Sequence, residues 1–340
     1  MACSVAPKRA GSERRMRWKE VLGRRAGLAA MLGVLLVAPW FVGSYYHFLL
    51  SLGLINVILA TGLNLLTGNA GQISLCHSSF MAIGAYATTF LFAKVGMTFW
   101  LALPLGSAVA GLFGLFLGLP ALRLRGFYLA VVTLGFLEIM QIIIESVPSV
   151  TGGVRGLPVP RPSLFGFQLG SDLALYYVIL AVTVAPPYAA WRLLNSPTGR
   201  AFNAIRVSEA AAQTLAMPVT RVKLIAFLVA APYAGMAGGL FATLVRFIDP
   251  LEFNVATSIR HVIFIVVGGL GSIAGSVVGA AVLTVLPELL RGFKEYNELV
   301  YGALLLLVLM VMPHGLVGLW PALRRLGARL HEGAAARLAR

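Results

Sequence analysis

Charged side chains are scarce in this chain of 340 residues. Asp, Glu, Lys and Arg make up 11% of the sequence, whereas hydrophobic residues make up 59%. Soluble domains carry about 25% charged residues, and a chain with so few could not cover a water-exposed surface. The mean hydropathy of +0.87 agrees with this. The deficit excludes an ordinary soluble domain and predicts an integral membrane protein.

Negative charge is scarcer still. The sequence holds 12 acidic against 27 basic residues, which gives a net charge of +15. Such an excess is also typical of nucleic-acid-binding proteins, but there the basic residues gather on one face. Here they lie between apolar runs, as the positive-inside rule of membrane proteins requires. We therefore expect no nucleic-acid partner.

Cysteines and catalytic motifs are almost absent. The two cysteines, Cys3 and Cys76, form no CxxC or Cys/His metal spacing. The sequence has no Walker A pattern, no HExxH and no Ser/His/Asp set at a usable spacing. We expect no catalytic residue, no cofactor and no metal. If ATP drives the process, another subunit binds it.

Apolar runs of about 20 residues, the length that a membrane-spanning helix needs, recur along the chain. They predict an all-α, polytopic helical membrane protein with about ten spans, including short or broken helices. The expected spans are 26–43, 46–66, 79–96, 98–122, 126–147, 173–191, 224–246, two within 253–290, and 299–319.

The distribution of basic residues predicts the topology. Residues 1–25 carry eight Lys or Arg and lack the features of a cleaved signal, so we expect a cytoplasmic tail. If 253–290 crosses twice, 20 basic residues lie inside and six outside, in accordance with the positive-inside rule. The expected organisation is a basic tail, a transmembrane domain over 26–320 with a cytoplasmic segment at 192–223, and a second cytoplasmic basic tail over 321–340.

Two glycine-rich segments interrupt the spans. One holds Gly68 and Gly71, and the other Gly268, Gly269 and Gly271. Backbone that leaves a helix at membrane depth must be buried in protein or line a wet cavity, and glycine-interrupted spans mark transport pathways. These segments therefore predict a transporter. The ridge of Gly271, Gly275 and Gly279 favours close helix packing.

Polar residues at membrane depth are candidates for the solute path, because such groups usually face the interior of the bundle. The first cluster holds Asn64, Gln72, Ser74 and His77, followed by Ser78 and Ser79. Two interpretations stay open for it. The side chains line the path, or they only satisfy one another and the broken backbone.

A second polar set lies on one predicted helix. Glu138, Gln141 and Glu145 follow the i, i+3, i+7 spacing that places residues on one helical face. They either line the path or tie this span to a neighbour. Arg260 and His261 are possible ionic partners, or they lie near the outer interface and extend their polar ends toward water.

The cytoplasmic segment 192–223 differs in kind from the spans. Ser208 can cap a short Ala-rich helix, and Pro218 bounds that helix downstream. The segment is either a helix that docks into a partner or a solvated loop.

The motifs just described, with several others, resemble those of the permease subunits of branched-chain amino acid (leucine/isoleucine/valine-type) ABC importers. The resemblance covers residues 50–320 in order. Its motifs lie at 61–68, 70–75, 77, 84–86, 122–130, 151–153, 209–212, 219–224, 268–272 and 313–316.

This resemblance implies a transport subunit rather than an enzyme, and the longer-N-terminus member of a permease pair. The implied partners are a second permease subunit, two cytoplasmic ATPase subunits, an extracytoplasmic solute-binding protein and membrane lipid of the bacterial cytoplasmic (inner) membrane. The implied ATPase-coupling residues are Arg206, Glu209, Ala210, Ala211 and Ala216. Thr151, from one of the matching motifs, joins the candidate path residues.

Three departures from the family pattern bear on substrate and coupling. Cys76 and Ala216 stand where the family usually has glycine, and Arg260-His261 occupies a commonly acidic region. Relatives carry urea, amides and aromatic acids as well, so the solute stays open. A stand-alone secondary transporter or channel and an intramembrane enzyme are the alternatives of other classes. We predict that Glu209→Lys uncouples transport without preventing membrane insertion.

Overall fold

The computed structural model describes residues 33–124, 126–164, 167–168, 170–289, 302, 306, 310 and 315–318. The chain divides into one unit that ends at His47 and a second that begins at Phe48. In the first unit, residues 33–37 are helical and η1 (Ala38–Phe41) follows. His47 Nε2 forms a hydrogen bond of 2.8 Å with the Pro39 carbonyl oxygen.

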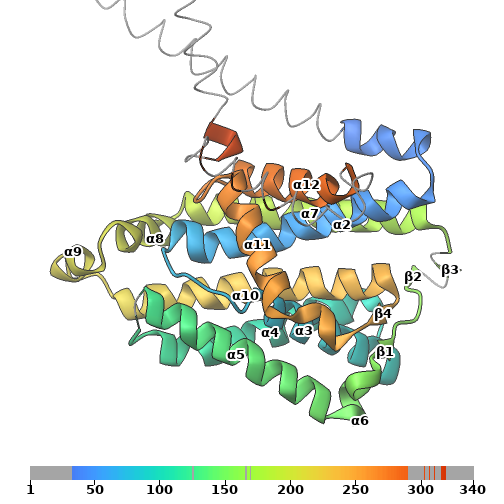
Figure 1. Cartoon of the computed structure of the whole chain (residues 1–340), viewed down its shortest axis with the longest axis horizontal. Helices are drawn as coiled ribbons and strands as arrows, with labels where there is room; N and C mark the ends of the chain where they lie inside the picture. The colour runs from blue at the N-terminus through green and yellow to red at the C-terminus, as the bar shows by residue number, and fades with distance from the viewer. Residues whose placement is uncertain are drawn as a thin grey trace, which may run out of the picture. The chain divides into compact units, whose positions relative to one another are not determined.

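In the rest of the described chain, the regular elements are helices and four two-residue strands (Figure 1). The long elements are α2 (Ser44–Leu63), α3 (His77–Thr89), α4 (Phe99–Ala121), α5 (Phe127–Ser146), α7 (Asp172–Leu194) and α10 (Val219–Val245). The shorter helices are η2 (Asn64–Asn69), η3 (Phe90–Lys94), α6 (Pro148–Thr151), η4 (Gly153–Arg155), α8 (Pro197–Val207), α9 (Glu209–Thr214), η5 (Pro250–Phe253), α11 (Val255–Gly268) and α12 (Ile273–Leu289). The strands β1 (Leu157–Pro158) and β4 (Phe247–Ile248) pair antiparallel, as do β2 (Ser163–Leu164) and β3 (Phe167–Gln168).

The all-α prediction is confirmed. Five described helices are long and apolar enough to cross a membrane: Ser44–Asn69, Phe99–Ala121, Phe127–Ser146, Asp172–Leu194 and Val219–Val245. They fall on the spans expected at 46–66, 98–122, 126–147, 173–191 and 224–246. Each has the length and hydropathy that the sequence pattern demands.

The other expected spans have different outcomes. The 253–290 stretch forms two short apolar helices, α11 and α12, separated at 269–272 as the glycines predict. The span expected at 79–96 corresponds to α3 with η3, whose polar residues keep it outside the apolar set. Residues 26–32 and most of 299–319 lie outside the described residues, so the total of ten spans stays a prediction.

The core of the second unit is formed by α3, α4 and α10 (Figure 1). Glycines let their backbones approach closely, as expected for helices that associate in lipid. A Cβ on Gly84 of α3 would collide with the backbone of Gly235 on α10, and one on Gly238 would collide with the Met81 carbonyl. A Cβ on Gly275 or Gly279 of α12 would likewise collide with the backbone of α11 or of the glycine segment after it, so the close packing predicted for these two glycines is confirmed.

A second apolar cluster joins α2 with α11 and α12. Leu63 of α2 packs with Phe264 of α11 and Leu283 of α12 among other buried residues. Asn56 Nδ2 donates to Thr284 Oγ1 at 2.9 Å, so a buried polar pair crosses the same seam. These contacts bring residues more than 200 positions apart in the sequence into one packed interface.

Candidate functional site: the double break and the coupling helices

The first break keeps helical hydrogen bonding longer than the sequence suggests. The chain continues from α2 as a π-helix, η2, to Asn69, runs without helix over residues 70–76, and resumes at His77. The break expected between the spans 46–66 and 79–96 therefore begins and ends inside helical residues. His77 and Ser78 belong to the first turn of α3.

Asn64 joins the first break to the second. Its Nδ2 donates to Ser276 Oγ at 2.7 Å and to the Ser272 carbonyl at 2.8 Å. Its Oδ1 accepts from the Gly271 backbone N–H at 2.8 Å. One buried amide therefore satisfies backbone groups that the second break leaves open, which fits the requirement that buried polar groups be hydrogen-bonded.

The glycines of both breaks hold conformations that other residues adopt at a cost. Gly71 has φ +68°, Gly271 has φ +82° and Gly269 has φ +130°, all in the region that favours glycine. Asn69 Nδ2 donates to the Gly271 carbonyl at 3.2 Å, and Gly68 lies against the Gly271 backbone. The two glycine segments found in the sequence are thus one structural feature.

The cytoplasmic segment 192–223, the coupling segment, contacts the two breaks directly. Helix α8 lies against η2, and a Cβ on Gly71 would stand 3.1 Å from the Arg206 Cα. The Arg206 guanidinium also lies beside Gly271. Glu209 Oε1 accepts a hydrogen bond from Gln72 Nε2 at 3.4 Å. The structure therefore brings together Arg206 and Glu209, predicted for coupling, with Gln72, predicted for the path.

Glu209 also has a cationic partner that the sequence analysis did not single out. Lys223 Nζ lies 2.6 Å from Glu209 Oε1, and the Lys223 side chain is 2% exposed. The same ammonium donates to the Leu124 carbonyl at 3.4 Å. In the sequence alone, Lys223 is one of several basic residues of the cytoplasmic segment 192–223. Only its place in the motif at 219–224 could have drawn attention to it.

The tip of the coupling segment is exposed and partly apolar. Ser208 Oγ accepts from the Ala211 backbone N–H at 3.2 Å, so the predicted cap of the Ala-rich helix is confirmed. Ala210 and Ala211 are exposed. Leu215 is 75% exposed and Val207 is 87% exposed. The described tip of the segment therefore presents apolar side chains on its exposed surface.

The polar residues around the start of α3 are buried and differ in their partners. Ser78 Oγ lies 2.7 Å from Ser258 Oγ of α11, and Ser74 Oγ lies 3.3 Å from Cys76 Sγ. His77 is fully buried against Phe80, and neither of its ring nitrogens has a hydrogen-bond partner among the described residues.

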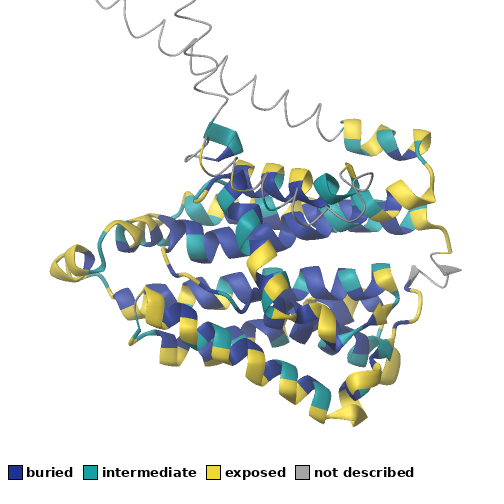
Figure 2. Cartoon of the chain, viewed as in Figure 1, coloured by how far each residue is buried: buried dark blue, intermediate teal, exposed yellow. Residues whose placement is uncertain are grey.

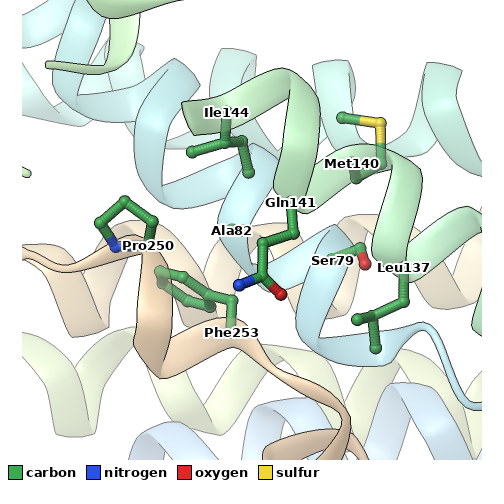
Figure 3. Close-up of a pocket in the computed structure, with 8 residues that line it drawn as sticks. All are labelled: Ser79, Ala82, Leu137, Met140, Gln141, Ile144, Pro250 and Phe253. Carbon is green, nitrogen blue, oxygen red and sulfur yellow. The ribbon is translucent and has the colours of Figure 1, made fainter. Parts of the chain in front are cut away.

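The polar residues of α5 separate into two groups. Gln141 points into a small cavity between α3, α5 and η5, where it faces Ser79 and Phe253 (Figure 3). Its Nε2 donates to Glu145 Oε1 at 3.3 Å. Glu138 is exposed on the outer side of the helix. Figure 2 shows that exposed residues run along that side of α5.

The ionic partners considered for the α5 carboxylates are wrong for the described residues. Arg260 is exposed, and His261 is buried against Phe264. Neither forms an ion pair with Glu138 or Glu145 within the part of the chain that the structure describes.

Thr151 uses its hydroxyl within the backbone. Its Oγ1 donates to the Ile144 carbonyl at 2.6 Å and lies 2.8 Å from the Val147 carbonyl. It also accepts from the Gly153 N–H at 3.1 Å. The residue therefore shapes the turn after α5.

Residues 45–309 match the protein family described as branched-chain amino acid transport system, permease component. The chain belongs to this family. The match covers both breaks, α5 and the coupling segment, so the site described above lies inside it. The chain is therefore a permease component and not itself an enzyme, and the alternatives of an intramembrane enzyme and a stand-alone transporter are wrong.

The permease is similar to two kinds of curated relative. It is 37% identical over 314 residues to the high-affinity branched-chain amino acid transport system permease protein LivM of Salmonella typhimurium and of Escherichia coli, covering 85% of this chain and 74% of each relative. It is 28% identical over 296 residues to LivH of Salmonella typhimurium, covering 79% and 92%. No solved structure matches it.

These similarities confirm the predicted family and the predicted paralogue. The permease is more similar to LivM than to LivH, and both are permeases of one transport system. It is a multi-pass membrane protein of a bacterial ABC importer family, and a pair of permeases belongs to such a system.

Proposed function

We propose that this permease forms half of an alternating-access path for branched-chain amino acids, driven by ATP hydrolysis in partner subunits. A binding protein outside the membrane delivers the solute, a second permease supplies the other half, and two cytoplasmic ATPases bind α8 and α9. The observation that carries the proposal is the contact of Arg206 with both breaks and of Glu209 with the first. A displacement of the coupling helices reaches the broken helices without an intervening element.

The exposed face of α9 is the proposed ATPase contact. Ala210, Ala211 and Leu215 point away from the fold, whereas Ala212 is buried. A short helix with one buried and one apolar exposed face fits a groove in a partner. Ala216 closes this helix and belongs to the same contact.

The path residues proposed are Asn64, Gln72, Ser74, His77, Glu138, Gln141 and Thr151. Glu138 gives the strongest support, because a carboxylate that faces hydrocarbon near the middle of a span costs about 2.5–3.5 kcal/mol. The exposed face of α4 carries the apolar Leu105, Leu112 and Phe116, whereas the exposed face of α5 carries Glu138 beside Ile139 and Ile142. We propose that α4 faces lipid and that the Glu138 side of α5 faces the path and the second permease.

The decisive experiment is uptake of radiolabelled leucine into proteoliposomes that hold the two permeases and the two ATPases, with binding protein outside and ATP inside. We expect uptake only with all components. Uptake by the permease alone, or with ATP omitted, would contradict the proposal. Competition by isoleucine and valine, against urea, acetamide and benzoate, decides between the substrate classes that the resemblance leaves open.

A surface variant tests the coupling contact separately. Leu215→Glu changes an exposed side chain, so the fold should persist while the ATPases dissociate from the permease pair. Val154, exposed outside the coupling segment, supplies the control Val154→Glu, which should keep them bound. Co-purification measures both.

The structure changes the expectation for Glu209→Lys. The substitution removes the anion beside Lys223 and places a second ammonium there. An unpaired buried charge is strongly destabilising, so we now expect loss of assembled permease in addition to uncoupling. Quantifying the variant in membranes tests this.

A further inference from the structure

Lys223 is a buried cation in the second turn of α10, on the cytoplasmic side of the proposed topology. Arg221, two residues earlier, is exposed. A buried ammonium persists only where an anion and hydrogen-bond acceptors surround it. The partners of Lys223 therefore identify which segments the fold holds together at this point.

Those partners come from two other segments, and one of them, Glu209, is also bonded to a third. Glu209 is the first residue of α9 and lies 2.6 Å from the ammonium. The Leu124 carbonyl, at 3.4 Å, belongs to the connection between α4 and α5. Gln72, from the first break, donates to the same Glu209 oxygen at 3.4 Å. One ion pair thus joins α9, α10, the α4–α5 connection and the break.

Helix α9 needs such an anchor. It has six residues, well below the length at which a helix is stable by itself. Only Ala212 is fully buried within it, and a methyl group contributes little packing energy. The ion pair between Glu209 and Lys223 is stronger than the packing of Ala212, and it fixes the position of α9 relative to α10.

Helix α10 leads from this anchor into the centre of the protein. It packs against α3 and α4 along its length, and α3 begins directly after the first break. Through α10 the ammonium connects a cytoplasmic surface helix with the helices that flank the proposed path. Gln72 provides the second, shorter connection.

We infer that Lys223 is a positioning residue for energy coupling. Its ammonium holds α9 against α10 and the first break, so that movement of α9 by an ATPase is passed to Gln72 and α10 rather than lost in bending of the segment. The inference rests on the proposed function, in which α8 and α9 receive the ATPases.

The test compares leucine transported per ATP hydrolysed in proteoliposomes of the complete complex. Lys223→Met keeps the apolar stem and removes the charge. We expect leucine per ATP to fall by about tenfold or more, because the buried Glu209 carboxylate loses its cationic partner, while ATP hydrolysis persists. The control Arg155→Met removes an exposed cation outside the coupling segment and should leave the ratio unchanged.

A second variant separates coupling from folding. The exchange Glu209→Lys with Lys223→Glu retains opposite charges at the same two positions, and we expect it to recover most of the ratio. If Lys223→Met fails to assemble, the leucine transported per ATP hydrolysed by this double variant tests the inference.

Three results would overturn the inference. Lys223→Met could transport leucine per ATP as the wild type does. Transport and hydrolysis could fall together in proportion to the amount of assembled complex, which is the mark of a purely structural residue. The exchange variant could assemble normally yet stay uncoupled. Failure of the wild type to show ATP-dependent uptake would instead reject the proposed function itself.

Discussion

Single side chains decide the geometry of the two breaks and of the coupling tip. Asn64 satisfies groups of the second break that no local helix can reach, and Ala216 holds φ +54° at the end of α9. Asn64 is surrounded by buried backbone groups of another segment, and Ala216 has a backbone conformation that favours glycine. The environment comes from the fold, so each can be tested by a substitution that changes little else.

Asn64→Leu should destabilise the permease by about 1–3 kcal/mol, because it leaves buried polar groups without partners. Thermal unfolding in detergent measures the loss. Thr61→Val is the matched control, because Thr61 Oγ1 donates only to the Val57 carbonyl of its own helix. An equal loss in both variants would contradict the role given to Asn64.

Ala216→Gly should stabilise the coupling segment by about 0.5–1 kcal/mol. The left-handed conformation costs a non-glycine residue about 1–2 kcal/mol, and the greater freedom of glycine in the unfolded chain offsets part of the gain. Ala211→Gly, at a helical position of α9, should instead destabilise. Chemical unfolding curves of the two variants should therefore shift in opposite directions.

At the scale of elements, close helix contacts separate the interior of the bundle from its outer faces. The seam between α3 and α10 depends on glycines that leave no room for a methyl group, whereas a Cβ added to the exposed Gly135 of α5 would meet no packed neighbour within 4 Å. The spacing of glycines in the sequence does not distinguish a glycine packed between two helices from an exposed one. The tertiary contacts distinguish them.

Gly238→Ala should lower the stability of the permease by 2 kcal/mol or more, a rough figure typical of overpacked cores, because its Cβ would meet the Met81 carbonyl. Gly135→Ala should be neutral or stabilising in the separate permease, since alanine favours helix. Melting temperatures of the two purified variants check this. A larger loss at Gly135 than at Gly238 would contradict the packing described for α3 and α10.

At the scale of the whole molecule, the number of crossings fixes the side on which each segment lies. The positive-inside rule favours two crossings over 253–290, and the structure divides this stretch into α11 and α12. Ten spans would then place the N-terminus, the coupling segment and the C-terminus on the ATPase side.

We therefore predict that a reporter fused after Arg340 and one fused before Met1 are both cytoplasmic. Alkaline phosphatase and green fluorescent protein fusions, which are active on opposite sides of the membrane, measure this. A periplasmic C-terminus would mean that α11 and α12 together cross only once, and the organisation into tails and a domain over 26–320 would need revision.

The sequence by itself determined the class, the family and most helices of this protein. Apolar run length and basic-residue distribution are local properties that the bilayer imposes on any spanning chain, and the ordered motifs that carry the family resemblance are local as well. The tertiary structure decided which polar residues meet. Asn64 reaches Ser276, Gln72 reaches Glu209, and Glu209 reaches Lys223, all across distances in the chain that no periodicity encodes. Burial then makes those pairs energetically significant, because low polarity strengthens a satisfied contact and penalises an unsatisfied one.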